Sequence, residues 1–194
     1  MIKFIAADLD GTLLKSSHAL PDGFMELVEK LYDMGITFAA ASGRQYYGVE
    51  KLFMPVRDKM MFIAENGGVA YEKGQLIYSL PMPADDVLAM VHEAEKLYDK
   101  GVRILLSGEN CAYVADSDKD FSDSCNTYCA RLKTVNDFSV IPDDDRIIKI
   151  ALFDKNAETQ VYPAMKRFSD DFNVILSTPA GWISWEKRST RALP

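Results

Sequence analysis

Two aspartates placed two residues apart, Asp8 and Asp10, are the residues of this chain best suited to chemistry. They end an apolar run that starts at Ile2, and Gly11 and Thr12 follow them. Because side chains two apart in a strand lie on the same side, both carboxylates can converge where the strand meets its loop. At about 4 Å and an effective dielectric near 20, their repulsion is roughly 4 kcal/mol. We therefore expect either a bound cation or one protonated acid.

Both arrangements are chemically useful. A carboxylate held by a metal ion can attack an electrophilic phosphorus, and a neighbouring acid of raised pKa can protonate the leaving oxygen. The alternative is a solvated Asp-Gly turn that closes a strand, since Asp and Gly are common turn formers. The apolar run before the acids favours chemistry, because a strand buried on both faces does not usually end in two acids for solubility alone.

The elements that must position these acids follow from the periodicity of the next residues. Apolar residues at helical spacing between two short apolar runs predict a βαβ unit, whose two strands are parallel. The polar segments Ser42–Arg44 and Glu65–Gly68 each follow such a strand. They should therefore meet the acids at one edge of the sheet, where α/β sheets bind ligands. The predicted elements are a strand over 2–7, a helix over 24–31, a strand over 36–41, a helix over 45–53, a strand over 60–64 and a hairpin of 69–71 with 76–78.

A second module is predicted after Pro81 and Pro83, where the pattern changes to a mixed α+β alternation. Its elements are predicted as a helix over 87–98, strands over 102–106, 111–115, 147–153 and 174–177, and a helix over 158–169. The polar stretch 116–145 is expected to be helix or loop, with Asp143–Asp145 as a solvated turn. Trp182, Ile183 and Trp185 alternate like a strand that re-enters the core. The predicted organisation is residues 1–80 as a first unit, 81–178 as an inserted module and 179–194 as a return to the first unit.

The composition argues against several classes of partner. The 194 residues are 48% apolar and carry a net charge of −7, whereas nonspecific nucleic-acid binding requires a cationic face. No run reaches the about 18 apolar residues of a membrane span. The N-terminal run is short, contains Asp8 and lacks a small-residue cleavage pattern. We therefore expect a cytoplasmic protein with no nucleic-acid or membrane partner.

The cysteines and histidines suggest no separate site. Cys125 and Cys129 are four residues apart, but two thiols without a nearby His or another Cys pair make a poor zinc site. We expect these two and Cys111 to be ordinary buried or half-buried thiols. His92 falls in a helical pattern with acidic neighbours and should lie at the surface, and His18 could at most touch a substrate.

The run Asp8-Leu9-Asp10-Gly11-Thr12, followed by Ser42-Gly43-Arg44 and then Glu65-Asn66-Gly67-Gly68, resembles the haloacid dehalogenase superfamily. Within it, the order of these motifs is most similar to the Cof-type sugar-phosphate phosphatases, which have a cap inserted after the third strand. The resemblance covers essentially the whole chain. It implies an α/β fold, with a Rossmannoid parallel sheet as the core and an inserted α+β cap domain.

The resemblance also implies the site residues. Asp8 would be the nucleophile that becomes a phosphoaspartate, and Asp10 would protonate the leaving alcohol and then activate water. The hydroxyls of Thr12 and Ser42, with the backbone amides of Leu9, Asp10 and Gly43, would hold the phosphoryl oxygens. Mg²⁺ would bind the Asp8 carboxylate and the Asp10 carbonyl. The two residues expected to contact a small phosphorylated substrate, a sugar phosphate above all, are Arg44 and Asn66.

Two elements of the family pattern are missing. The family has a lysine, usually followed by glycine, after the cap, and later an acidic loop that helps to hold Mg²⁺. Here Lys187 lacks that pattern and the chain ends in Ser189–Pro194. With suitable codons, a one-base shift in reading frame turns this end into Val-Asp-Lys-Gly-Thr-Ala, so we hypothesise a frameshifted or prematurely ended relative of a longer phosphatase. Family strands that pair beyond the first strand would then be absent, and we expect that edge to form a homo-oligomer.

Two other functions are compatible with the acid pair. A receiver-like module would bind Mg²⁺ and be phosphorylated without catalysing hydrolysis. It would, however, need an aspartate after the third strand, where this chain has Asn66. A phosphomutase shares the acid pair. The leading prediction is an Mg²⁺-dependent phosphatase of small phosphorylated metabolites.

Overall fold

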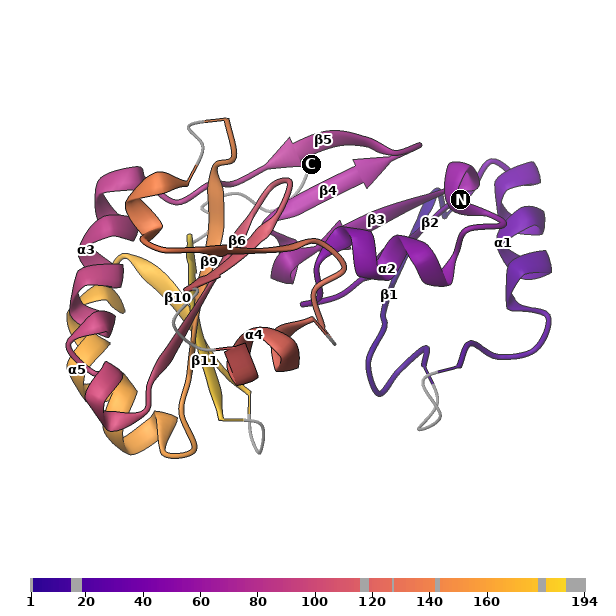
Figure 1. Cartoon of the computed structure of the whole chain (residues 1–194). Coiled ribbons are helices and arrows are strands. Elements are labelled where there is room, and N and C mark those ends of the chain that lie inside the picture. Colours follow the sequence, from indigo (N-terminus) through magenta and orange to yellow (C-terminus); the bar gives the residue numbers. More distant parts are fainter. Residues whose placement is uncertain are drawn as a thin grey trace. The chain divides into compact units, whose positions relative to one another are not determined.

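The computed structural model describes residues 2–14, 19–115, 119–126, 128–141, 144–177 and 181–187. The chain divides into two compact units, Met1–Ser79 and Leu80–Pro194 (Figure 1). The sequence interpretation placed this boundary after residue 80. His18, Asp143 and the tail Ser189–Pro194, which entered that interpretation, lie outside the described residues.

The first unit is a five-stranded sheet with two helices. Its strand order is β1-β2-β3-β4-β5, in which β1, β2 and β3 are parallel and the last two strands form an antiparallel hairpin. This arrangement confirms the predicted βαβ pattern and hairpin. The elements are β1 (Phe4–Asp8), α1 (Phe24–Asp33), β2 (Thr37–Ala41), α2 (Tyr46–Leu52), β3 (Met60–Ala64), β4 (Val69–Glu72) and β5 (Gln75–Ser79).

Aromatic rings fix both helices to one face of this sheet. Phe24 of α1 packs edge-on against Phe38 of β2, with ring centroids 5.4 Å apart, and Phe53 packs against Phe62 of β3 at 5.9 Å. On the opposite face, alternate residues of β1 are exposed, including Phe4. The expectation that β1 is buried on both faces was therefore wrong: β1 ends the sheet, and the described helices cover only one face.

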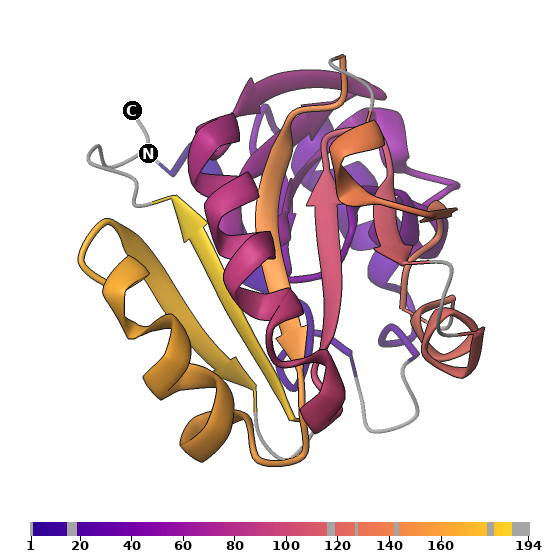
Figure 2. The same cartoon turned by 60° about the vertical axis from the view of Figure 1, so that its left-hand side comes forward.

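The second unit is a six-stranded sheet in the order β10-β11-β9-β6-β7-β8, antiparallel except between β7 and β8. Figures 1 and 2 show α3 and the helical segment that contains α5 on the same face of this sheet. That segment starts with a π-helical turn. The elements are α3 (Ala84–Glu95), β6 (Arg103–Gly108), β7 (Ala112–Ala115), α4 (Lys119–Cys125), β8 (Leu132–Val135), β9 (Ile147–Phe153), the π turn (Ala157–Val161), α5 (Tyr162–Met165), β10 (Phe172–Ser177) and β11 (Trp182–Lys187).

The last strand corrects the predicted organisation. β11 lies between β10 and β9, so residues 182–187 belong to the second sheet and do not return to the first unit. The cause is the same alternation that identified a strand. Ile183 and Trp185, which are 2% and 0% exposed, lie on the face covered by the helices and join its apolar core.

The stretch 116–145 also differs from expectation. It contains β8, whose edge position and exposed Lys133 and Thr134 explain why no apolar alternation announced it. Asp145, expected in a solvated turn, is 5% exposed. Its carboxylate accepts hydrogen bonds from the Asn110 amide at 2.8 Å and from the Tyr113 hydroxyl at 2.6 Å. Asp145 thus ties the turn between β6 and β7 to the start of β9.

Replacing Tyr113 by phenylalanine should therefore destabilise the second unit by about 1–3 kcal/mol, because one donor to a buried carboxylate is lost. Burial raises the pKa of the Tyr113 hydroxyl, with a further contribution from its bond to Asp145, so the hydroxyl remains a donor at neutral pH. Denaturant unfolding measures the change. The matched control, Tyr128→Phe, alters a side chain that is 66% exposed and should leave the midpoint unchanged. Equal midpoints for both variants would contradict the assignment.

The other predictions outside the site hold. Cys111, Cys125 and Cys129 are free and buried, as expected. His92 is exposed on α3. The strands predicted over 60–64 and 147–153 have those bounds in the structure.

Candidate active site

The loop after β1 exposes the two aspartates because its leucines are buried. Leu9 and Leu14 are 0% and 4% exposed, and the Leu14 amide donates to the Leu9 carbonyl at 2.8 Å. Gly11, with φ of 77°, supplies the left-handed residue that this tight loop requires. The loop therefore turns back on itself and leaves Asp8 and Asp10 at the surface.

Each aspartate has its own partner. The Thr12 hydroxyl donates to Asp8 Oδ2 at 3.3 Å. Arg44, in the loop after β2, grips Asp10 with two donors: Nε donates to Oδ2 at 2.9 Å, and Nη2 donates to Oδ1. The sequence argument allowed a cation or a proton to relieve the repulsion between the acids. The structure adds a guanidinium, because a bidentate arginine neutralises one carboxylate.

The end of β2 places Ser42 beside the first loop. Ala41 is the register partner of Asp8, and the Leu9 amide donates to the Ala41 carbonyl at 2.9 Å. Since that amide continues the β1–β2 ladder, its predicted role as a phosphate donor does not fit this structure. The Ser42 hydroxyl, in a residue 6% exposed, accepts the Arg44 amide at 3.1 Å and keeps its own hydrogen for another acceptor.

The loop after β3 is tied to the loop after β2. The Asn66 amide donates to the Ser42 carbonyl at 3.2 Å, and the Glu65 amide donates to the Arg44 carbonyl at 3.1 Å. Gly43 is required by this approach, since a Cβ there would lie 2.4 Å from Asn66 Oδ1. The three predicted polar segments therefore meet at the same edge of the sheet.

Glu65 is the residue of this region that the sequence interpretation gave no role. Glu65 and Asn66 have φ of 50° and 57°, and Gly67 follows at 91°. Left-handed backbone at non-glycine residues costs about 1–3 kcal/mol each and gathers at functional sites. The Glu65 side chain is only 3% exposed, so a carboxylate is buried beneath this loop. The signal in the sequence was an acid followed by Asn-Gly-Gly directly after a buried strand.

A substitution at Gly43 tests this packing. In Gly43→Ala the new Cβ must push the Asn66 amide aside, which costs little stability because the side-chain end can move. We expect kcat/KM for a phosphomonoester to fall about tenfold while the unfolding midpoint changes little. Gly35→Ala is the control, because nothing lies within 4 Å of the position of its Cβ. A Gly43→Ala protein with unchanged kinetics would show that the Asn66 amide has no part in the reaction.

The oxygen-rich edge fits a small divalent cation. Mg²⁺ prefers oxygen ligands and is commonly held by one or two carboxylates together with water and substrate phosphate. Asp8 supplies such a carboxylate, whereas Asp10 is engaged by Arg44. Among the residues that the structure describes, there is no group of three or more His, Cys, Asp or Glu able to hold a metal by itself.

A family comparison decides what this arrangement belongs to. Residues 5–188 match the family model of the haloacid dehalogenase-like hydrolases. The chain belongs to this family. The resemblance inferred from the motifs is therefore confirmed, and the acids, Ser42 and Asn66 are placed in a hydrolase of known family.

Named relatives of this hydrolase are phosphatases. It is 31% identical over 188 residues to the 5-amino-6-(5-phospho-D-ribitylamino)uracil phosphatase YbjI of Escherichia coli, covering 94% of this chain and 67% of that protein. Its fold matches SMU.1108c of Streptococcus mutans with a TM-score of 0.81 and 24% identity, over 97% of this chain and 71% of that one. It also matches the subclass IIB sugar phosphatase BT4131 with a TM-score of 0.71 and 21% identity, over 96% and 70% of the two chains. The chain spans about half the length, 50–51%, of two further curated relatives.

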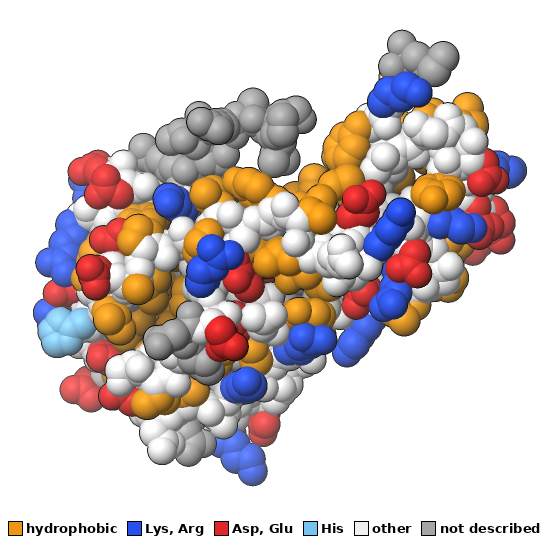
Figure 3. Space-filling model, turned by 90° about the horizontal axis from the view of Figure 1, so that it is seen from above, with side chains coloured by type: hydrophobic (Ala, Val, Ile, Leu, Met, Phe, Trp, Pro, Cys, Tyr) orange, Lys and Arg blue, Asp and Glu red, His pale blue; other side chains and the backbone are white. Residues whose placement is uncertain are grey.

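Two surface features accompany these findings. Within the described ranges, none of the helices combines the length and the apolar character needed to span a bilayer. On the face seen in Figure 3, acidic and basic side chains are interspersed.

Proposed function

We propose that this hydrolase is a phosphatase of the Cof type that removes the phosphoryl group from small phosphorylated metabolites through a phosphoaspartate on Asp8. One observation carries the proposal: the loops after β1, β2 and β3 are bonded to one another around Asp8, through Arg44 with Asp10 and Ser42 with Asn66. Acid, hydroxyl, guanidinium and amide groups are then available at one sheet edge, as phosphoryl transfer requires.

In the first step an Asp8 carboxylate oxygen attacks phosphorus, and the bond from phosphorus to the leaving oxygen breaks. Asp10 gives its proton to that oxygen, so a neutral alcohol leaves. For this step Asp10 must exchange its contact with Arg44 for the leaving group. Asp10 then takes a proton from water as the water oxygen attacks phosphorus, which releases phosphate and restores the Asp8 carboxylate.

The donors around Asp8 would hold the equatorial oxygens of the phosphoryl group. The Ser42 hydroxyl keeps a hydrogen to donate, and Thr12 can turn from Asp8 to the substrate. We propose that the Asp8 carboxylate and the Asp10 carbonyl hold Mg²⁺. Bound there, the ion would neutralise charge that develops on the transferring group.

The direct test measures phosphate release from an aryl phosphate with and without Mg²⁺. We expect release that depends on added Mg²⁺ and stops when a chelator removes it. A chain that releases no phosphate above the uncatalysed rate in Mg²⁺, from an aryl phosphate and from a panel of sugar phosphates, would refute the proposed function.

The substrate class follows from the relatives and the contacts. The E. coli relative is named for a phosphorylated ribitylamino-uracil, and BT4131 is named as a sugar phosphatase. We propose a sugar phosphate or similar metabolite, contacted by Arg44 and Asn66. The cytoplasmic location expected from the sequence stays a prediction.

The free edge of β1 supports a homo-oligomer. β1 ends the first sheet, is uncharged before Asp8, and is flanked by Ile2 at 67% exposure and Phe4 at 47%. Such edges pair with other strands. We expect a dimer by light scattering, and a monomer for Phe4→Lys, because a charge on an edge strand discourages pairing. Leu76→Lys on β5 is the control and should leave the dimer intact. A monomeric parent chain at all concentrations would rule out this interface.

A further inference from the structure

A row of polar side chains crosses the face of the second sheet that points away from α3 and α5. Ser107 on β6 is the register partner of Lys149 on β9, and Lys149 is the partner of Glu186 on β11. Glu186 in turn is the partner of Asn173 on β10. Directly opposed residues project from the same face, with Cβ atoms about 4.5–5.5 Å apart. These four residues therefore form one continuous row, here called the polar row.

The polar row is buried at one end and open at the other. Ser107, Lys149 and Glu186 are only 3%, 9% and 7% exposed, whereas Asn173 is exposed. Lysine and glutamate are rarely buried to this extent. On the opposite face, the row of Leu106, Ile150 and Trp185 is part of the apolar core. Because apolar replacement of buried opposite charges is often neutral or stabilising, stability alone does not explain the polar row.

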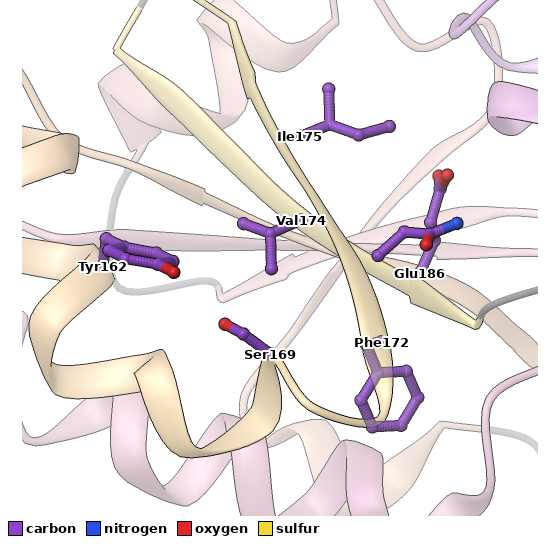
Figure 4. Close-up of a pocket in the computed structure, with 7 residues that line it drawn as sticks. Tyr162, Ser169, Phe172, Val174, Ile175 and Glu186 are labelled. Atoms are coloured by element: carbon purple, nitrogen blue, oxygen red, sulfur yellow. The ribbon is translucent and has the colours of Figure 1, made fainter.

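A hollow of about 440 Å³ lies along β10 at the open end of the polar row. In Figure 4, Ile175 and Glu186 lie on one side of β10, and Tyr162, Ser169 and Val174 lie on the other. Asn173 also lines the hollow. Its volume is within the range of about 300–1,000 Å³ that is usual for small-molecule sites. The hollow thus gives a small molecule access to the exposed end of the row.

The charges and hydrogen-bonding groups of the polar row define the ligand. The positive charge of Lys149 and the negative charge of Glu186 cancel, so the row offers no net charge to balance an anion or a cation. It does offer ammonium and amide donors, carboxylate and amide acceptors, and a hydroxyl that can do both. Its members repeat at the strand spacing of about 4.8 Å, which suits a chain of carbon atoms that carries several hydroxyls.

We propose that the polar row and the hollow beside β10 bind a neutral polyol, or the neutral polyol part of a larger molecule. This site goes beyond the proposed phosphatase activity, since binding a polyol requires neither Asp8 nor phosphoryl transfer. Each hydroxyl of the ligand would give and accept one hydrogen bond along the row.

The variants must separate binding from folding. Lys149→Met or Glu186→Gln alone leaves one buried charge opposite a neutral side chain, which can unfold the protein. The double variant Lys149→Met/Glu186→Gln removes both charges and keeps the side-chain volumes, so it should remain folded. The matched control, Lys133→Met/Glu158→Gln, makes the same changes at two exposed residues of the same unit.

Saturation-transfer NMR with sorbitol, gluconate and glucamine tests the proposal on the full chain, because these three six-carbon probes differ mainly in charge. We expect saturation transfer to sorbitol for the parent and the control, and binding at least about tenfold weaker for the folded double variant. Gluconate and glucamine should bind more weakly than sorbitol. The proposal is overturned if sorbitol receives no transfer from the parent up to roughly 10 mM, if the double variant binds it as well, or if a charged probe binds better.

Asp8→Asn keeps this test independent of the proposed function. That variant should bind sorbitol like the parent, whether or not the parent releases phosphate. Loss of sorbitol binding in Asp8→Asn would place the polyol at the catalytic residues and overturn a separate site. Absence of phosphate release with intact sorbitol binding would instead refute only the phosphatase.

Discussion

Asp8→Asn should lower Mg²⁺-dependent phosphate release by more than about 10³-fold. Loss of a single electrostatic contact already costs about 10²–10³-fold, and this substitution removes both the nucleophile and the charge that binds the cation. Asparagine keeps the size of the side chain and can still accept from the Thr12 hydroxyl, so the loop after β1 should keep its structure. The measurement is the initial rate of phosphate release at saturating Mg²⁺.

The control for this experiment is Asp22→Asn, which removes one exposed carboxylate from the same unit without touching the site. It should retain the parent rate. Acid quenching during turnover should trap a phosphorylated Asp8 peptide in the parent and not in Asp8→Asn. If Asp8→Asn and the parent released phosphate equally fast, Asp8 would not be the nucleophile.

The position of this site could be predicted because its motifs coincide with strand ends. Asp8, Ser42 and Asn66 each follow a short apolar run, and parallel pairing of those runs brings their ends together. That inference needs only strand periodicity and the parallel connection, both of which are local properties of the sequence.

The contacts within the site depend on details that no spacing rule contains. The grip of Arg44 on Asp10 depends on a rotamer, and the engagement of the Leu9 amide depends on how far the β1–β2 ladder continues. The left-handed backbone of Glu65 and Asn66 is imposed by their bonds to Arg44 and Ser42. Each is a tertiary effect that overrides local preference.

The fate of β11 shows the same limit at the level of the fold. Periodicity identified a strand around Trp182–Trp185, but the choice of sheet depends on which partner its apolar face meets. The hairpin with β10 and the pairing with β9 decide it, since Trp185 lies opposite Val174 and Ile150. Alternation reports that a face is buried and does not report against what.

Trp185→Ala should therefore destabilise the second unit by about 3–5 kcal/mol, because it empties the space of a fully buried side chain in the core beneath α3 and α5. Amide hydrogen exchange resolves the effect by segment, since exchange follows local as well as global opening. We expect faster exchange in β9 and β11 and unchanged exchange in β2 and β3. The control is Tyr128→Ala, an aromatic truncation at a residue that is 66% exposed in the same unit. Faster exchange in β2 and β3, with β9 unaffected, would instead return this strand to the first sheet.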